Sequence, residues 1–103
     1  MTNITTEEAQ ELMKQGATVL DVRTKDEYTE GHIENAVNID FYDPEFAENI
    51  KGLDKAKQYV VHCQSGGRSA KATALMEELG FVSACNVLGG ISSWKEKGLP
   101  VVG

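Results

Sequence analysis

The sequence has few of the residues that build metal clusters or disulfide-stabilised folds. It contains two cysteines, Cys63 and Cys85, and two histidines in 103 residues. The two cysteines are too widely spaced for a metal-binding motif, and a single pair is too few for a disulfide framework. We therefore expect no metal and no cofactor. We expect a cytoplasmic protein, because Cys63 can stay a free thiol in that reducing compartment.

Long apolar runs and an excess of basic residues are also missing. No apolar stretch approaches the roughly 18 residues of a membrane-spanning helix, and residues 1–5 lack the basic and apolar regions of a signal peptide. The net charge is −6, which argues against binding to nucleic acid or to an anionic membrane surface. The length suits one domain, so we expect a single domain over residues 1–103, and Met1 favours a complete protein.

The sequence does show alternating strand and helix patterns. Compact runs of β-forming residues predict strands at 18–22, 36–39, 59–62 and 81–88. Helical patterns are predicted after the capping box of Thr5 and Glu8, around 26–30, from Asp43-Pro44, from Arg68 to Leu79 and after Gly89-Gly90. Short strands that alternate with helices indicate an α/β fold with a largely parallel sheet covered on both faces.

One segment combines a strand, a cysteine and the start of a helix. Cys63 follows the predicted strand 59–62, Gly66-Gly67 forms a flexible loop, and a helix is predicted from Arg68. Ligands of parallel sheets bind beyond the carboxyl ends of the strands, where Cys63 is expected. Unpaired amides at a helix start favour an anion, so we expect the pKa of Cys63 to lie below that of an ordinary thiol. Nucleophilic attack also requires that the sulfur atom is open to solvent and faces these amides.

Four segments together resemble the single-domain rhodanese family, and they span nearly the whole chain. They are Leu20-Asp21-Val22-Arg23 with Glu27-Tyr28, Gly31-His32-Ile33 with residues 36–39, the loop from Cys63 to Ser69, and Gly80-Phe81 with Leu88-Gly89-Gly90, Trp94 and residues 98–101. The resemblance implies a five-stranded, mainly parallel sheet flanked by helices on both faces. It also implies a sulfurtransferase that moves sulfane sulfur from a donor such as thiosulfate to cyanide or a thiol through a persulfide on Cys63.

The resemblance assigns roles to individual residues as well. It implies substrate-binding roles for Gln64, Ser65, Gly66, Gly67, Arg68 and Ser69, and supporting roles for Asp21, Arg23 and His32. Arg68 either contacts the donor or forms an ion pair that braces the loop. The implied partners are a small sulfur-containing anion as donor and a thiol, cyanide or a thioredoxin-like protein as acceptor. Arg68 is the loop's only charged side chain, whereas two-domain thiosulfate sulfurtransferases carry more positive charge there, so another persulfide or a protein is an alternative donor.

Several alternatives stay open at this point. The domain could be a persulfide carrier or a protein-binding module with little small-molecule turnover. Phosphatase or arsenate reductase activity is less favoured, because related enzymes of those classes have five residues between cysteine and arginine and this loop has four. Cys85 is interpreted as a core residue rather than a resolving thiol, and Trp94 likewise as core. His62 is expected to face away from the sulfur of Cys63. Phe41 and Tyr42 either line the rim of the site or pack against a helix.

Overall fold

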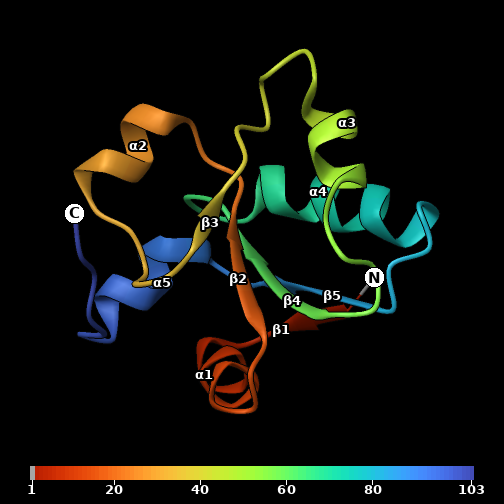
Figure 1. Ribbon diagram of the computed structural model, residues 1–103. Coiled ribbons are helices and arrows are strands. Elements are labelled where there is room, and N and C mark those ends of the chain that lie inside the picture. Colours follow the sequence, from red (N-terminus) through yellow and green to blue (C-terminus); the bar gives the residue numbers. More distant parts are fainter. Residues whose placement is uncertain (1) are drawn as a thin grey trace.

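The computed structural model describes residues 2–103, which form one α/β unit (Figure 1). Its elements, in chain order, are β1 (Thr2–Ile4), α1 (Thr6–Lys14), β2 (Thr18–Asp21), α2 (Lys25–Glu30), β3 (Val37–Asn38), α3 (Phe46–Lys51), β4 (Gln58–His62), α4 (Gly67–Glu78), β5 (Ser83–Val87) and α5 (Gly90–Glu96). No helix in this part of the chain is both long and apolar enough to cross a membrane.

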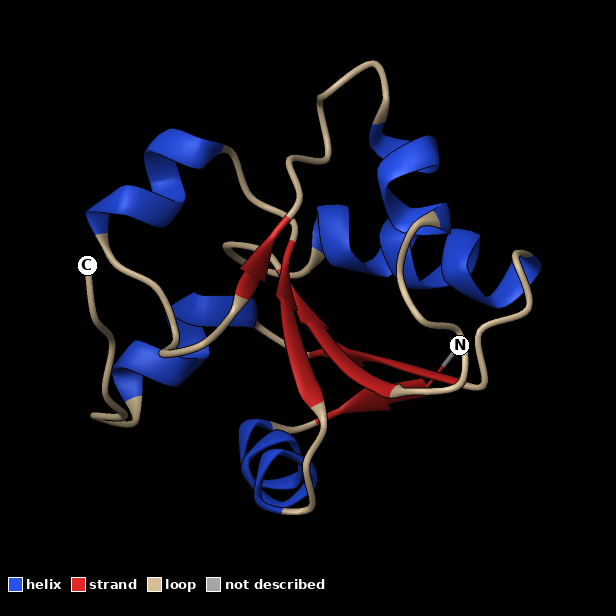
Figure 2. Ribbon diagram, viewed as in Figure 1, coloured by secondary structure: helices blue, strands red, loops and turns tan. Residues whose placement is uncertain are grey.

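The five strands form one parallel sheet in the order β1-β5-β4-β2-β3. β4 therefore lies at the centre, where its residues pair with β2 on one side and with β5 on the other (Figure 2). Val61 is in register with both Leu20 and Asn86. The residue that follows β4 is Cys63, so the candidate nucleophile sits at the carboxyl edge of the central strand.

Helices cover both faces of the sheet (Figure 1). On one face, α3 and α4 bury Ile50 and Met76 against Leu20 and Val61. On the other face, α1 packs on Val60 through Ala9, and Trp94 of α5 joins a further apolar cluster. A central parallel strand that is covered on both sides is expected to be apolar throughout, as the Tyr-Val-Val run of β4 is. The two layers of helices bury β4 up to its last residue, His62.

The main sequence predictions of secondary structure are confirmed. Thr5 and Glu8 form a complete capping box at the start of α1. In α4, Ala72 and Met76 are fully buried, and Gly80 beyond the helix has a φ of 87°, a conformation that glycine adopts without strain. These local signals are short-range, so the fold does not override them.

Two features of the fold were not predicted correctly. β1 was missed, because only Ile4 of its three residues is buried and the strand forms by pairing with β5. The helix expected at Asp43-Pro44 begins later, at Phe46, so that prediction was wrong in its position. Asp43 instead accepts hydrogen bonds from the backbone N–H groups of Glu45, through its side chain, and of Phe46, through its carbonyl, which makes a turn before α3.

Candidate active site

Cys63 lies at the base of the loop that joins β4 to α4. Gly66 has a φ of 120°, which only glycine adopts readily, and this conformation turns its N–H group back toward the cysteine. The Gly66 N–H donates a hydrogen bond to Cys63 Sγ over 3.1 Å. The sulfur atom therefore faces the amides at the start of α4, as the sequence predicted.

Hydrogen bonds favour the ionised form of Cys63. Burial by itself raises the pKa of the thiol, but hydrogen bonds from the Ser69 hydroxyl and from the amides of Ser69, Gly66 and Ser65 outweigh it. The pKa of Cys63 consequently lies below the ordinary value of 9.0. The predicted direction of the pKa shift is confirmed, and its cause is mainly hydrogen bonding to the sulfur.

The Ser69 hydroxyl has competing acceptors. Its Oγ lies 3.4 Å from Cys63 Sγ, 3.3 Å from the Gly66 carbonyl oxygen and 2.6 Å from Asn86 Oδ1. A hydroxyl has one hydrogen and donates one strong hydrogen bond at a time. The shortest contact is to Asn86, so donation to sulfur requires that Ser69 gives up this bond. The Gly66 amide is the donor without such a competitor.

The sulfur atom is not open to solvent, which corrects the sequence-based expectation. Cys63 is only 1% exposed, although Gln64, Ser65 and Gly67 directly above it are exposed. The reason is that the loop folds back over the cysteine in order to bring the Gly66 amide within hydrogen-bonding distance. In this structure the loop residues, and not the sulfur, therefore face solvent.

The amino end of α5 is hydrogen-bonded to the start of this loop. Ile91 N–H donates to the Cys63 carbonyl and Ser92 N–H to the Gln64 carbonyl, each over 3.0 Å, and Gln64 Nε2 donates to Ser92 Oγ over 3.1 Å. Gly90 makes this approach possible: a Cβ atom at this position would lie 2.5 Å from the Cys63 carbonyl oxygen and 2.7 Å from that of Gln64. The amino end of α5 thus positions the backbone of Cys63 and Gln64.

Arg68 forms an ion pair with a residue of α2. Its guanidinium donates to both carboxylate oxygens of Glu27, over 2.7 and 2.9 Å, and its Cζ lies 5.6 Å from the centre of the Tyr42 ring. The hydrogen bonds from Arg68 lower the pKa of Glu27 to about 2. Of the two roles left open for Arg68, these contacts favour the brace between the loop and α2.

A buried polar group lies beside the loop on the opposite face of β4. Arg23 Nη2 donates to Asp21 Oδ2 and to the Gly31 carbonyl oxygen, each over 2.8 Å. His62 Nδ1 lies 3.0 Å from the Cys63 carbonyl, which can only accept, so Nδ1 carries a hydrogen. Burial lowers the pKa of His62 and keeps it neutral. His62 therefore faces away from the sulfur, as predicted.

His32 supports the segment between α2 and β3. Its ring stacks on Tyr28 at 3.7 Å between centroids, and Nδ1 lies 2.8 Å from the Tyr28 carbonyl oxygen. Its backbone also pairs with Val102. These contacts suit the supporting role that the resemblance implies for it.

The aromatic residues 41 and 42 differ in environment. Phe41 packs edge-on against Phe46 of α3 with 5.1 Å between ring centroids. Tyr42 is 66% exposed and lies against the Arg68 guanidinium. Phe41 thus follows the helix-packing alternative, and Tyr42 the rim alternative.

Comparison with known proteins places the chain in a family. The model of the rhodanese-like domain matches residues 5–97. This chain belongs to the rhodanese-like domain family. It is 35% identical over 102 residues to thiosulfate sulfurtransferase 16 of Arabidopsis thaliana, a match that covers 89% of this chain and 85% of that protein. It is 34% identical over 89 residues to thiosulfate sulfurtransferase GlpE of Pseudomonas fluorescens, which covers 86% and 80%.

The solved structures agree with this family and with the fold. A rhodanese-related protein from Thermoplasma volcanium superposes with a TM-score of 0.89 at 40% identity and covers 99% of this chain and 98% of its own. A rhodanese-like domain protein from Staphylococcus aureus superposes with a TM-score of 0.83 at 32% identity and covers both chains completely. The predicted five-stranded parallel fold is therefore confirmed, and the named relatives support sulfurtransferase activity in general.

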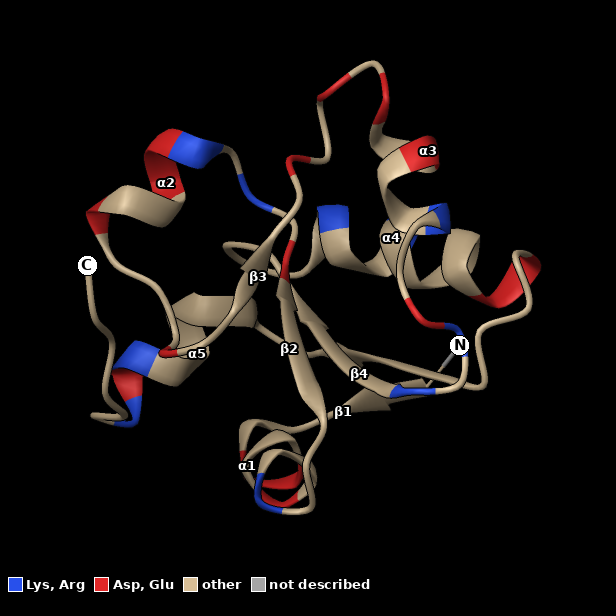
Figure 3. Ribbon diagram, viewed as in Figure 1, with Lys and Arg blue, Asp and Glu red and all other residues tan. Residues whose placement is uncertain are grey.

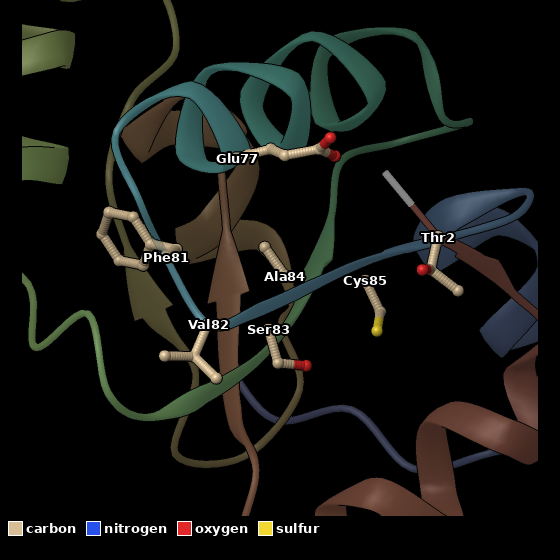
Figure 4. Close-up of a pocket in the computed structure, with 7 residues that line it drawn as sticks. All are labelled: Thr2, Glu77, Phe81, Val82, Ser83, Ala84 and Cys85. Atoms are coloured by element: carbon tan, nitrogen blue, oxygen red, sulfur yellow. The ribbon is translucent and has the colours of Figure 1, made fainter.

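The second cysteine of this rhodanese-like domain lies apart from the loop. Cys85 is in register with Val60, on the face covered by α1, whereas Cys63 joins the apolar cluster on the α4 face. Cys85 lines a cavity of about 190 Å³ near the amino ends of β1 and β5, whereas Cys63 follows the carboxyl end of β4. The cavity is also lined by Thr2, Glu77, Phe81, Val82, Ser83 and Ala84 (Figure 4). The sulfur of Cys85 points away from α4 in this view. Cys85 is therefore a core residue, as predicted, and does not meet Cys63.

Three contacts with the loop were not predicted from the sequence. Glu27, Asn86 and the amino end of α5 all act on the loop from distant positions in the chain. Glu27 and Gly89-Gly90 were noted as parts of the family pattern, but nothing in a single sequence says which loop they contact. Asn86 gave no signal, because an asparagine in a strand has no pattern of its own.

Proposed function

We propose that this rhodanese-like domain transfers sulfane sulfur by way of a persulfide on Cys63. The observation that carries the proposal is the 3.1 Å hydrogen bond from the Gly66 N–H to Cys63 Sγ. A thiolate attacks a sulfane sulfur faster than a thiol does, and this hydrogen bond favours the thiolate. A second sulfur atom that bears a negative charge would be stabilised in the same way by backbone amides at the start of α4.

The transfer consists of two exchanges of sulfur–sulfur bonds. In the first, Cys63 Sγ attacks the sulfane sulfur of the donor, the donor's S–S bond breaks, and the remainder leaves with the bonding electrons, as sulfite does from thiosulfate. The product is Cys63–S–S⁻. In the second, an acceptor thiolate or cyanide attacks the terminal sulfur, and Cys63 leaves as the thiolate. Charge and electrons balance in both exchanges.

A carrier function with slow small-molecule turnover is the second candidate. It is favoured by the 1% exposure of Cys63, since a buried persulfide is protected from unintended acceptors until the loop moves. Phosphatase activity has less support, because the arginine that would hold a phosphate is paired with Glu27. The rate of transfer to small thiols, set against transfer to thioredoxin-like proteins, separates the first two candidates.

Mass spectrometry after incubation with a sulfane donor tests the proposal. The wild-type chain is expected to gain the mass of one sulfur atom, and peptide mapping is expected to place that atom on Cys63. A dithiol added afterwards is expected to remove it. The proposal is wrong if no sulfane donor adds sulfur to Cys63, or if the added sulfur lies on Cys85.

A further inference from the structure

The positive charge of Arg68 is already neutralised within the domain. Both oxygens of the Glu27 carboxylate accept hydrogen bonds from the guanidinium, and the two side chains are only 30% and 17% exposed. Tyr42 covers one face of the guanidinium. In the part of the chain that the structure describes, Arg68 is also the only charged side chain of the loop. A donor at Cys63 therefore meets an ion pair and no net positive charge.

The elements around the loop add mostly negative charge. α2 carries Asp26 and Glu30 besides Glu27, and the connection before α3 carries Asp40, Asp43 and Glu45 (Figure 3). Besides Arg68, α2 and α4 carry two basic residues, Lys25 and Lys71. Arg23, beside the loop, is already paired with Asp21. Neither lysine forms an ion pair with any described residue, but together they do not balance the acidic groups. Such a surface repels a dianion more than a donor with one negative charge or none.

We propose that the Glu27–Arg68 pair makes this site selective for alkyl persulfides over thiosulfate. The inference rests on the function proposed above. Thiosulfate brings two negative charges to a cysteine that reacts as the thiolate, and unpaired cations would favour such a donor. A persulfide R–S–SH brings at most one charge to the reacting end. Cys63 thiolate attacks its terminal sulfur, the S–S bond breaks, and R–S⁻ leaves and takes the proton, which gives R–SH and Cys63–S–S⁻.

Glu27→Gln is the variant that tests the pair directly. Thr24 is the N-cap residue of α2, and Glu27 accepts a hydrogen bond from its N–H group. Glutamine at position 27 can keep this hydrogen bond through its amide oxygen. The substitution therefore removes the carboxylate charge with little cost to α2. Glu78→Gln is the matched control, because it makes the same change in net charge at the other end of α4.

The experiment measures kcat/KM for three donors: thiosulfate, cysteine persulfide and a persulfidated cysteine peptide. The two persulfides show whether a small molecule or a peptide is the better donor. We expect wild-type kcat/KM to be at least about ten-fold lower for thiosulfate than for the better persulfide. Glu27→Gln is expected to raise the thiosulfate value about ten-fold and the persulfide values less than about three-fold, because the released charge acts twice as strongly on a dianion. Glu78→Gln is expected to change neither.

The salt dependence gives a second readout that a purely structural role of the pair would not alter. Wild-type transfer from thiosulfate is expected to speed up with ionic strength, since screening weakens repulsion, and this dependence is expected to shrink in Glu27→Gln. The inference is overturned if the wild-type kcat/KM for thiosulfate equals that for the persulfides, or if Glu27→Gln changes kcat/KM for both kinds of donor by the same factor. If persulfide transfer is still observed in either of these cases, only the donor selectivity is contradicted and the proposed function stands. If no donor adds sulfur to Cys63, the donor selectivity and the proposed function are both wrong.

Discussion

Replacing Cys63 with serine is expected to abolish sulfur transfer, with a loss of at least about a thousand-fold in rate. A hydroxyl at this position is not ionised near neutral pH and cannot form a persulfide. The fold is expected to persist, because serine is close to cysteine in size and its oxygen can accept the hydrogen bond that Gly66 N–H now gives to sulfur. Steady-state transfer from a persulfide to a dithiol, together with thermal unfolding of the same sample, measures both effects.

Cys85→Ala is the control for this result. Cys85 lies in the core on the opposite face of the sheet, so its loss is expected to leave the transfer rate within about two-fold of wild type while it lowers stability by about 1 kcal/mol. Transfer that survives in Cys63→Ser, or disappears in Cys85→Ala, would contradict the role given to Cys63.

The second large effect is expected from Gly90→Ala, because Gly90 packs directly on the backbone of Cys63 and Gln64. Gly90 has a φ of 54°, and a methyl group there would lie 2.5 Å from the Cys63 carbonyl oxygen. The amino end of α5 would have to move away from the loop, which strains or breaks the bonds from Ile91 and Ser92. A shift of about 1 Å at a reacting atom is enough to slow transfer about a hundred-fold. The strain and the overpacking are expected to cost about 3 kcal/mol of stability.

Gly98→Ala separates the effect of the contact from that of backbone strain. Gly98 has a similar φ of 73°, but a Cβ there meets nothing within 4 Å. We expect this control to lose about 1 kcal/mol of stability through the strained backbone and to keep its transfer rate. The transfer rates of both variants are measured well below their unfolding temperatures, so that a loss of rate reports on the contact with the loop and not on unfolding. Equal rates in the two variants would show that α5 does not position the loop.

The position of the nucleophile could be predicted from sequence because its signals are local. The apolar run of β4, the glycines of the loop and the helical period of α4 are adjacent in the chain, and each acts within a few residues. Their combination places Cys63 between a strand end and a helix start. The resemblance to rhodaneses added the fifth strand, which the residues Thr2–Ile4 did not indicate by themselves.

The interactions that tune the site could not be predicted in the same way. Glu27 meets Arg68 from 41 positions away in the chain, and Ser92 of α5 meets Gln64 across 28 positions. Such contacts depend on how distant elements pack together, and no pattern in one sequence encodes them. The burial of Cys63 also follows from tertiary structure, because it depends on how far the loop folds over the sulfur.

Hydrogen bonds from the loop favour the thiolate form of Cys63, and the pH dependence of its alkylation tests this most directly. Iodoacetamide reacts with the thiolate, so the rate of modification at Cys63 follows ionisation of that residue. Because hydrogen bonds lower the pKa of the folded protein's thiol, we predict a midpoint below 9.0, followed by mass spectrometry of the Cys63 peptide. A larger fraction of Cys63 than of an ordinary thiol would then be ionised at each pH below 9.0. A midpoint at or above 9.0 would contradict the account, because burial would then outweigh the amides that face the sulfur.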